Sequence, residues 1–125
     1  MQSDCRFSLL RCVCAVFTLC LLVQPLLAHA ILLESSPAAN STISGPDVPL
    51  QLRFNVRIDL SRSRLILVHP DGTLEQLVIK KDTKADIVAA DTAELKPGEY
   101  RLRWQVLASD GHITRGEVLF AVAGV

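Results

Sequence analysis

The sequence predicts an all-β domain, an antiparallel sandwich or small barrel of about seven short strands. Three observations lead to this fold class. Several runs alternate apolar and polar residues with a period of two, which is typical of strands with one buried face. Turn-forming pairs such as Gly45-Pro46, Asp71-Gly72 and Pro97-Gly98 separate these runs. No window of residues 29–125 has the apolar stripe of an amphipathic helix.

The run over residues 98–108 shows the clearest alternation. Tyr100, Leu102, Trp104 and Val106 share one face, and polar side chains occupy the other. Aromatic residues on the apolar face of a strand usually belong to the core. We therefore expect Trp104 to pack inside the domain rather than to bind a ligand.

Four further runs complete the strands that the pattern defines well. Residues 49–56 alternate, residues 63–70 are more continuously apolar, residues 73–81 follow a Pro-Asp-Gly turn, and residues 116–125 form the last run. Because no linker or repeat divides them, we expect one domain over residues 29–125.

Residues 1–28 have the layout of a cleaved secretory signal peptide. Arg6 and Arg11 precede an uncharged apolar run from Cys12 to Val23, and small residues follow. The alternative is a retained membrane anchor, but a spanning helix needs about 20 apolar residues. We therefore expect an exported mature protein that is not embedded in a membrane.

Composition then restricts the partners of the mature chain. Removing 28 of 125 residues leaves 97, with 11 basic and 12 acidic side chains and no stripe of Lys or Arg, so nothing indicates nucleic acid. All four cysteines and the single methionine lie in the removed segment. The mature chain therefore lacks the sulfur ligands that select Cu(I).

Three histidines are the candidate metal ligands: His29, His69 and His112. His69 lies beside a Pro-Asp-Gly turn with no acidic partner at ligand spacing, so we interpret it as a surface residue. Asp110 and His112 are two residues apart, and on extended backbone their side chains would point to the same side. The alternative is an ordinary Asp-Gly hairpin turn in which His112 has no function.

His29 would add further metal ligands to Asp110 and His112 if it is the first mature residue. An N-terminal histidine offers its amine and its imidazole to one metal, and the amine has an ordinary pKa of about 7.7–8.0. With His112 and Asp110, three nitrogens and one oxygen suit tetragonal Cu(II), although Zn(II) can use similar ligands. The A-x-A rule, however, favours cleavage after Ala30, which would remove His29.

The sequence resembles the periplasmic copper-resistance protein C (CopC-like) family. The resemblance rests on HAILLESSPAANSTIS at the mature start, LRFN, LKPGEYRLRWQVLASDGH and GEVLFAV, and it runs from residue 29 to about residue 122. It implies a Greek-key, immunoglobulin-like β-sandwich, a periplasmic location and one Cu(II) per chain. It further implies that His29, with its amine, Asp110 and His112 are the ligands, and that cleavage precedes His29.

Two departures from the family limit what the resemblance implies. Some members have an acidic residue near the copper after the early-strand phenylalanine, where this chain has Asn55 and Val56. Some members also have a methionine-rich Cu(I) site, which this mature chain cannot build. Partnership with an inner-membrane CopD-type copper transporter is implied by the resemblance alone.

Three functions are therefore weighed. The first is a non-enzymatic periplasmic Cu(II)-binding protein that buffers or carries copper for resistance or homeostasis. The second is a small copper oxidoreductase, because an N-terminal histidine plus a second histidine resembles the histidine brace of copper-dependent polysaccharide oxygenases. The third is a metal-free immunoglobulin-like interaction module. We expect the first.

Overall fold

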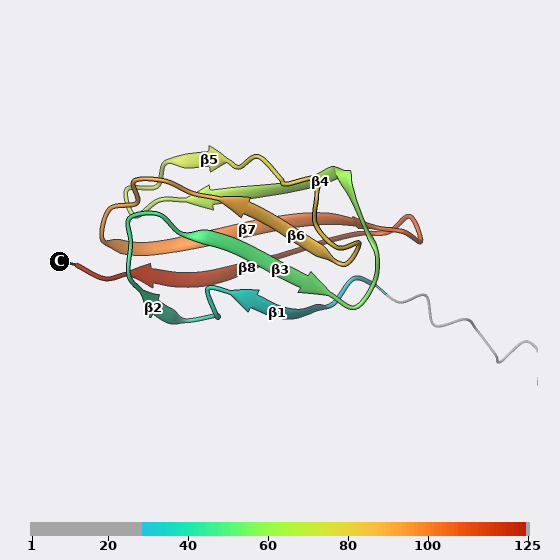
Figure 1. The fold of residues 1–125 in the computed structure, drawn as a ribbon, viewed down its shortest axis with the longest axis horizontal. Coiled ribbons are helices and arrows are strands. Elements are labelled where there is room, and N and C mark those ends of the chain that lie inside the picture. The colour runs from blue at the N-terminus through green and yellow to red at the C-terminus, as the bar shows by residue number, and fades with distance from the viewer. Residues whose placement is uncertain (1–28, 125) are drawn as a thin grey trace, which may run out of the picture.

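Residues 29–124 form two β-sheets packed face to face, as described by a computed structural model (Figure 1). The signal peptide predicted at residues 1–28 lies outside the described residues. The strands are β1 Leu32–Ser36, β2 Ser41–Ile43, β3 Pro49–Phe54, β4 Ile58–Val68, β5 Leu74–Gln76, β6 Ile87–Asp91, β7 Gly98–Ala108 and β8 Ile113–Val122. Within this part of the chain, no helix is long and apolar enough to cross a membrane.

The chain passes repeatedly between the two sheets, as in a Greek key. One sheet has the order β1-β3-β6, and the other has the order β2-β8-β7-β4-β5. Figure 1 shows the smaller sheet lying across the larger one, with the β7–β8 turn at one end of the sandwich and the chain's C-terminus at the other. The predicted all-β sandwich is confirmed.

The core lies between the two sheets and is built by the alternating strands. The inner face of β7 carries Tyr100, Leu102, Trp104 and Val106, all of them buried as predicted. The ring of Trp104 packs edge-on against Phe54 of β3, with ring centroids 5.2 Å apart. This contact joins the two sheets and gives Trp104 the core role that the alternation predicts.

Three details of the strand assignment differ from the expectation. There are eight strands rather than about seven, and β2 pairs with β8 in parallel rather than antiparallel. The sequence pattern does not define β1, β2 or β6: β2 has only three residues, and the central residues of β6 are all buried, so its polarity does not alternate. A continuous apolar run carries no period from which a strand can be recognised.

The strand expected over residues 73–81 is the third difference, because β5 ends at Gln76. Beyond it, the backbone N–H of Leu77 donates to Leu65 of β4, whereas the N–H of Lys80 donates to Ala89 of β6. The segment therefore crosses from the larger sheet to the smaller one, and this crossing leaves Val78 86% exposed.

Gly116 of β8 makes room for the indole of Trp104. The two residues are paired across β7 and β8, and a Cβ on Gly116 would overlap Cζ2 and Cε2 of the Trp104 ring. The absence of a side chain at residue 116 therefore lets the largest core side chain lie flat against the neighbouring strand.

We predict that Gly116→Ala lowers the free energy of unfolding by about 1–3 kcal/mol, the usual cost of overpacking a core. Chemical denaturation followed by the fluorescence of Trp104 measures this loss. Gly124→Ala is the matched control, because the nearest atom to its added Cβ is Pro97 Cβ at 4.0 Å. Equal stability of both variants would contradict the tight packing at Gly116.

Candidate metal centre

Asp110 and His112 lie in the tight turn that joins β7 and β8. The backbone N–H of His112 donates to Asp110 Oδ1 over 3.0 Å, and the N–H of Ala108 donates to the carbonyl of His112 over 2.9 Å. Gly111 has a φ of 90°, a conformation that glycine adopts without a steric penalty. The backbone here is a hairpin turn rather than an extended strand, and this turn also places the two side chains together.

The two side chains present a pair of donor atoms. His112 Nδ1 lies 3.3 Å from Asp110 Oδ2, yet within the described residues this buried nitrogen has no hydrogen-bond partner. The two atoms are thus close without being aligned for a hydrogen bond. Ligands that each bind one ion at about 2.0–2.1 Å lie roughly 3 Å apart. The observed separation therefore fits two neighbouring ligands of one metal.

The carboxylate of Asp110 is held in its charged form by this turn. The backbone N–H of His112 is the main cause that lowers the pKa of Asp110, burial partly opposes it, and the nearby His112 and His29 side chains add to the lowering. A hydrogen bond to the charged form favours ionisation. Asp110 is therefore available as an anionic ligand at neutral pH.

The N-terminal segment brings His29 to the same turn. The imidazole rings of His29 and His112 meet edge to face, with centroids 5.3 Å apart. His29 is exposed, whereas the next residue, Ala30, is only 3% exposed and belongs to the core. Ala30 thus anchors the segment while His29 stays accessible beside the turn.

Asn55 fixes this segment to the end of β3. Its side-chain Oδ1 accepts a hydrogen bond of 2.7 Å from the backbone N–H of Ile31, and its own N–H donates to the carbonyl of Ile31 over 3.1 Å. The sequence analysis considered Asn55 only as a missing acidic ligand and did not predict its role as an anchor for Ile31. No local sequence pattern reveals this role, because it depends on the pairing of β1 with β3, which brings Leu32 opposite Phe54.

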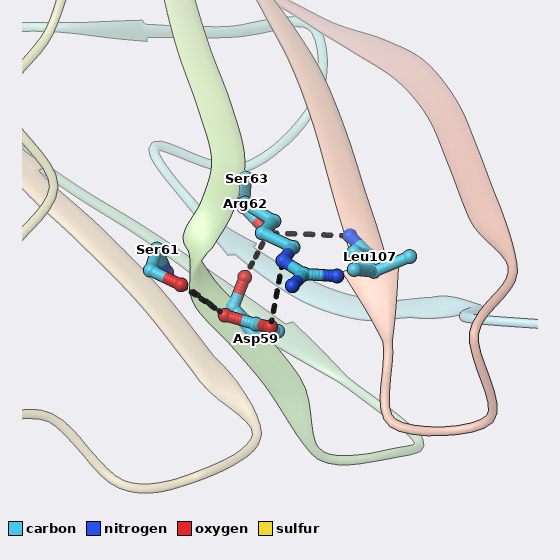
Figure 2. A network of polar contacts seen from close by, with 5 residues as sticks. All are labelled: Asp59, Ser61, Arg62, Ser63 and Leu107. Atoms are coloured by element: carbon cyan, nitrogen blue, oxygen red, sulfur yellow. Dashed lines mark hydrogen bonds and ion pairs between the residues drawn. The ribbon is translucent and has the colours of Figure 1, made fainter.

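A polar network next to the turn supports the end of β7 (Figure 2). Between Asp59 and Arg64, β4 bulges away from β7. The buried hydroxyl of Ser63 bridges this bulge: it donates to the carbonyl of Asp59 over 2.7 Å and accepts from the N–H of Leu107 over 3.2 Å. The N–H of Leu107, three residues before Asp110, therefore keeps a hydrogen-bond partner despite the bulge.

The predicted ligands come together only in part. The structure brings His112 next to Asp110 and brings His29 next to His112, as the distances above show. Within residues 29–124, however, no group of three His, Cys, Asp or Glu side chains is arranged to hold a metal. In the unprocessed chain, the nitrogen of His29 is an amide rather than an amine. The nitrogen-rich set would be complete only after cleavage before His29.

His69 lies at the opposite end of the sandwich. It follows Val68, which pairs with Arg101 near the start of β7, whereas the metal candidates follow the end of β7. The expectation that His69 has no acidic partner is wrong, because its Nε2 lies 3.2 Å from Glu75 Oε1. The chain reversal between β4 and β5 brings the two residues together.

The chain is similar to several known proteins. The CopC domain model matches residues 32–123, which include Asp110 and His112 but not His29. Protein YobA of Escherichia coli is 33% identical over 118 residues, covering 90% of this chain and 94% of that protein. Copper resistance protein C of Xanthomonas campestris is 31% identical over 104 residues, covering 76% of this chain and 80% of that protein.

A solved structure is similar in fold as well as in sequence. The crystal structure of CopC from Methylosinus trichosporium matches with a TM-score of 0.68 and 29% identity, covering 75% of this chain and 93% of that one. This match agrees with the sandwich architecture described above.

We predict that Asn55→Ala releases the segment that carries His29. Loss of one hydrogen bond costs about 0.5–1.5 kcal/mol, so the Ile31 amide should exchange its hydrogen roughly 2–10 times faster. Hydrogen exchange followed by NMR measures this rate. Asn55→Asp is the matched control, since a carboxylate oxygen can still accept from Ile31. Unchanged exchange in Asn55→Ala would contradict the anchoring role.

Proposed function

This chain belongs to the CopC domain family, and on that premise we propose that it is a Cu(II)-binding protein that holds one copper ion per chain through His29, Asp110 and His112. The observation that carries the proposal is the β7–β8 turn. There, an unpartnered His112 Nδ1 lies 3.3 Å from the Asp110 carboxylate, and the His29 ring lies against His112. In this proposal the protein carries copper and does not use it as a resident cofactor.

Cleavage immediately before His29 is part of the proposal. It gives His29 a free amine, which together with two imidazoles and one carboxylate forms a set suited to tetragonal Cu(II). Cleavage after Ala30 would instead remove a side chain that is 3% exposed and packed in the core. The packing of Ala30 therefore supports the earlier cut, against the A-x-A preference of the leader.

The site is suited to carriage rather than catalysis. The β7–β8 turn, which carries Asp110 and His112, lies at one end of the sandwich, as the ribbon in Figure 1 shows for the turn itself. Two cavities, of about 810 Å³ and 400 Å³, are lined by other residues. A substrate oxidised at the copper would need a surface beside the metal, whereas a carrier needs only an accessible ion. We therefore propose that the protein buffers copper in the periplasm or delivers it to a CopD-type transporter of the inner membrane.

We predict that His112→Ala weakens Cu(II) binding by more than the roughly 10–100-fold that loss of an outer-shell partner costs. A titration of the processed protein against a competing chelator measures the affinity. His69→Ala is the matched control, because it removes an imidazole from the opposite end of the sandwich. Equal affinities of the two variants would contradict the assignment of His112.

We predict that Cu(II) binding weakens steeply as the pH falls from 7 to 5. Protons compete with the metal for imidazole nitrogen, whose ordinary pKa is about 6.5. The lowered pKa of Asp110 keeps its carboxylate ionised through this range, so the loss should come from the histidines. The chelator titration repeated at each pH measures it, and an affinity independent of pH would argue against histidine ligands.

A further inference from the structure

The outer face of the larger sheet gathers arginines from three adjacent strands. Gln105 of β7 pairs with Arg64 of β4 on one side and with Arg115 of β8 on the other. In the next row that faces outward, Arg103 pairs with Ile66 and Glu117. Because alternate side chains of a strand share a face, Arg64, Arg103 and Arg115 project on the side away from the core.

The positive charge of these arginines is poorly neutralised. Glu117 lies between them in the register, but its carboxylate pairs with Arg101 at 3.6 Å. Arg115 Nε donates to the uncharged side chain of Gln105 over 2.9 Å. Within residues 29–124, neither Arg64 nor Arg103 forms an ion pair with an acidic side chain. Gln105, which lies between Arg64 and Arg115, carries no charge that could neutralise them. The patch therefore offers positive charge to an anion.

The same three arginines line one cavity. Its volume is about 400 Å³, and its lining residues are Arg64, Ile66, Arg103, Trp104, Gln105, Arg115, Gly116 and Glu117. This volume falls within the roughly 300–1,000 Å³ that is typical of small-molecule sites. The cavity is thus larger than a bare oxyanion needs, and Ile66 adds apolar surface. Such a lining suits an anion that carries an organic group.

A neighbouring cavity lacks this excess of free positive charge. It has a volume of about 810 Å³ and includes Arg101 and His69 in its lining. Both cationic candidates already have acidic partners, since Arg101 lies 3.6 Å from Glu117 and His69 lies 3.2 Å from Glu75. The contrast favours the arginine cavity as the anion site.

We propose that the cavity lined by Arg64, Arg103 and Arg115 binds a small phosphate ester. Guanidinium groups pair with phosphate oxygens through two parallel hydrogen bonds, and the charge of the three arginines is not neutralised by Glu117, whose carboxylate pairs with Arg101. The ester could be a free metabolite or the glycerophosphate part of a lipid headgroup. This activity is separate from copper binding, because it uses none of the proposed copper ligands.

The test uses the metal-free processed protein and the fluorescence of Trp104, the single tryptophan of the chain. Glycerol 3-phosphate is titrated at low salt, and phosphatidylglycerol vesicles are compared with neutral phosphatidylcholine vesicles. Arg103→Gln should weaken binding about tenfold or more, the effect of losing one charge-assisted hydrogen bond. Arg53→Gln is the matched control, because it removes one arginine from the other sheet, where it pairs with Glu34.

Each outcome decides the proposal. Saturable binding of glycerol 3-phosphate that is lost in Arg103→Gln supports a soluble ligand, and the same pattern with phosphatidylglycerol vesicles alone supports a lipid headgroup. No binding of either probe, or equal weakening by Arg53→Gln and Arg103→Gln, overturns it. Copper affinity measured on the same variants should stay unchanged, which separates failure of this site from failure of the copper site.

Discussion

The antiparallel pairing of β7 with β8 is the constraint on which the rest of the structure depends. The ladder runs without interruption from Gly98 opposite Val122 to Leu107 opposite Ile113. One face of this ladder carries the aromatic core, the other carries the arginine cavity, and its closing turn carries Asp110 and His112. A change of register by one residue would exchange the two faces, so core, cavity and metal candidates all require the same pairing.

The two-residue alternation of apolar and polar side chains predicted the all-β fold, because this alternation can be read within each strand's own residues. Tyr100 and Trp104 could be assigned to the core from their own run, and both are buried. The strand β6 could not be recognised, because its central residues are all buried and give no alternation. The parallel pairing of β2 with β8 could not be inferred either, since residues about 80 positions apart set it.

The candidate ligand residues could be named from the sequence, but the contacts that hold them in place could not. Residue type and spacing identified Asp110 and His112, the place of His29 at the end of the predicted leader made it the third candidate, and the resemblance favoured cleavage before it. The anchoring of Ile31 by Asn55 is a contact over 24 positions of sequence, which no local pattern encodes. The burial of Ala30 is likewise a tertiary property. Both features help to hold His29 beside the β7–β8 turn. The sequence alone does not say whether His29 lies there.

The central claim is that copper is held by an N-terminal His29 together with the β7–β8 turn. Electron paramagnetic resonance of the Cu(II) complex, with mass spectrometry of the exported protein, tests it most directly. The account predicts a mature chain that begins at His29 and one tetragonal Cu(II) signal coupled to several nitrogens. A mature chain that begins at Ile31, or a signal without nitrogen coupling, would contradict it.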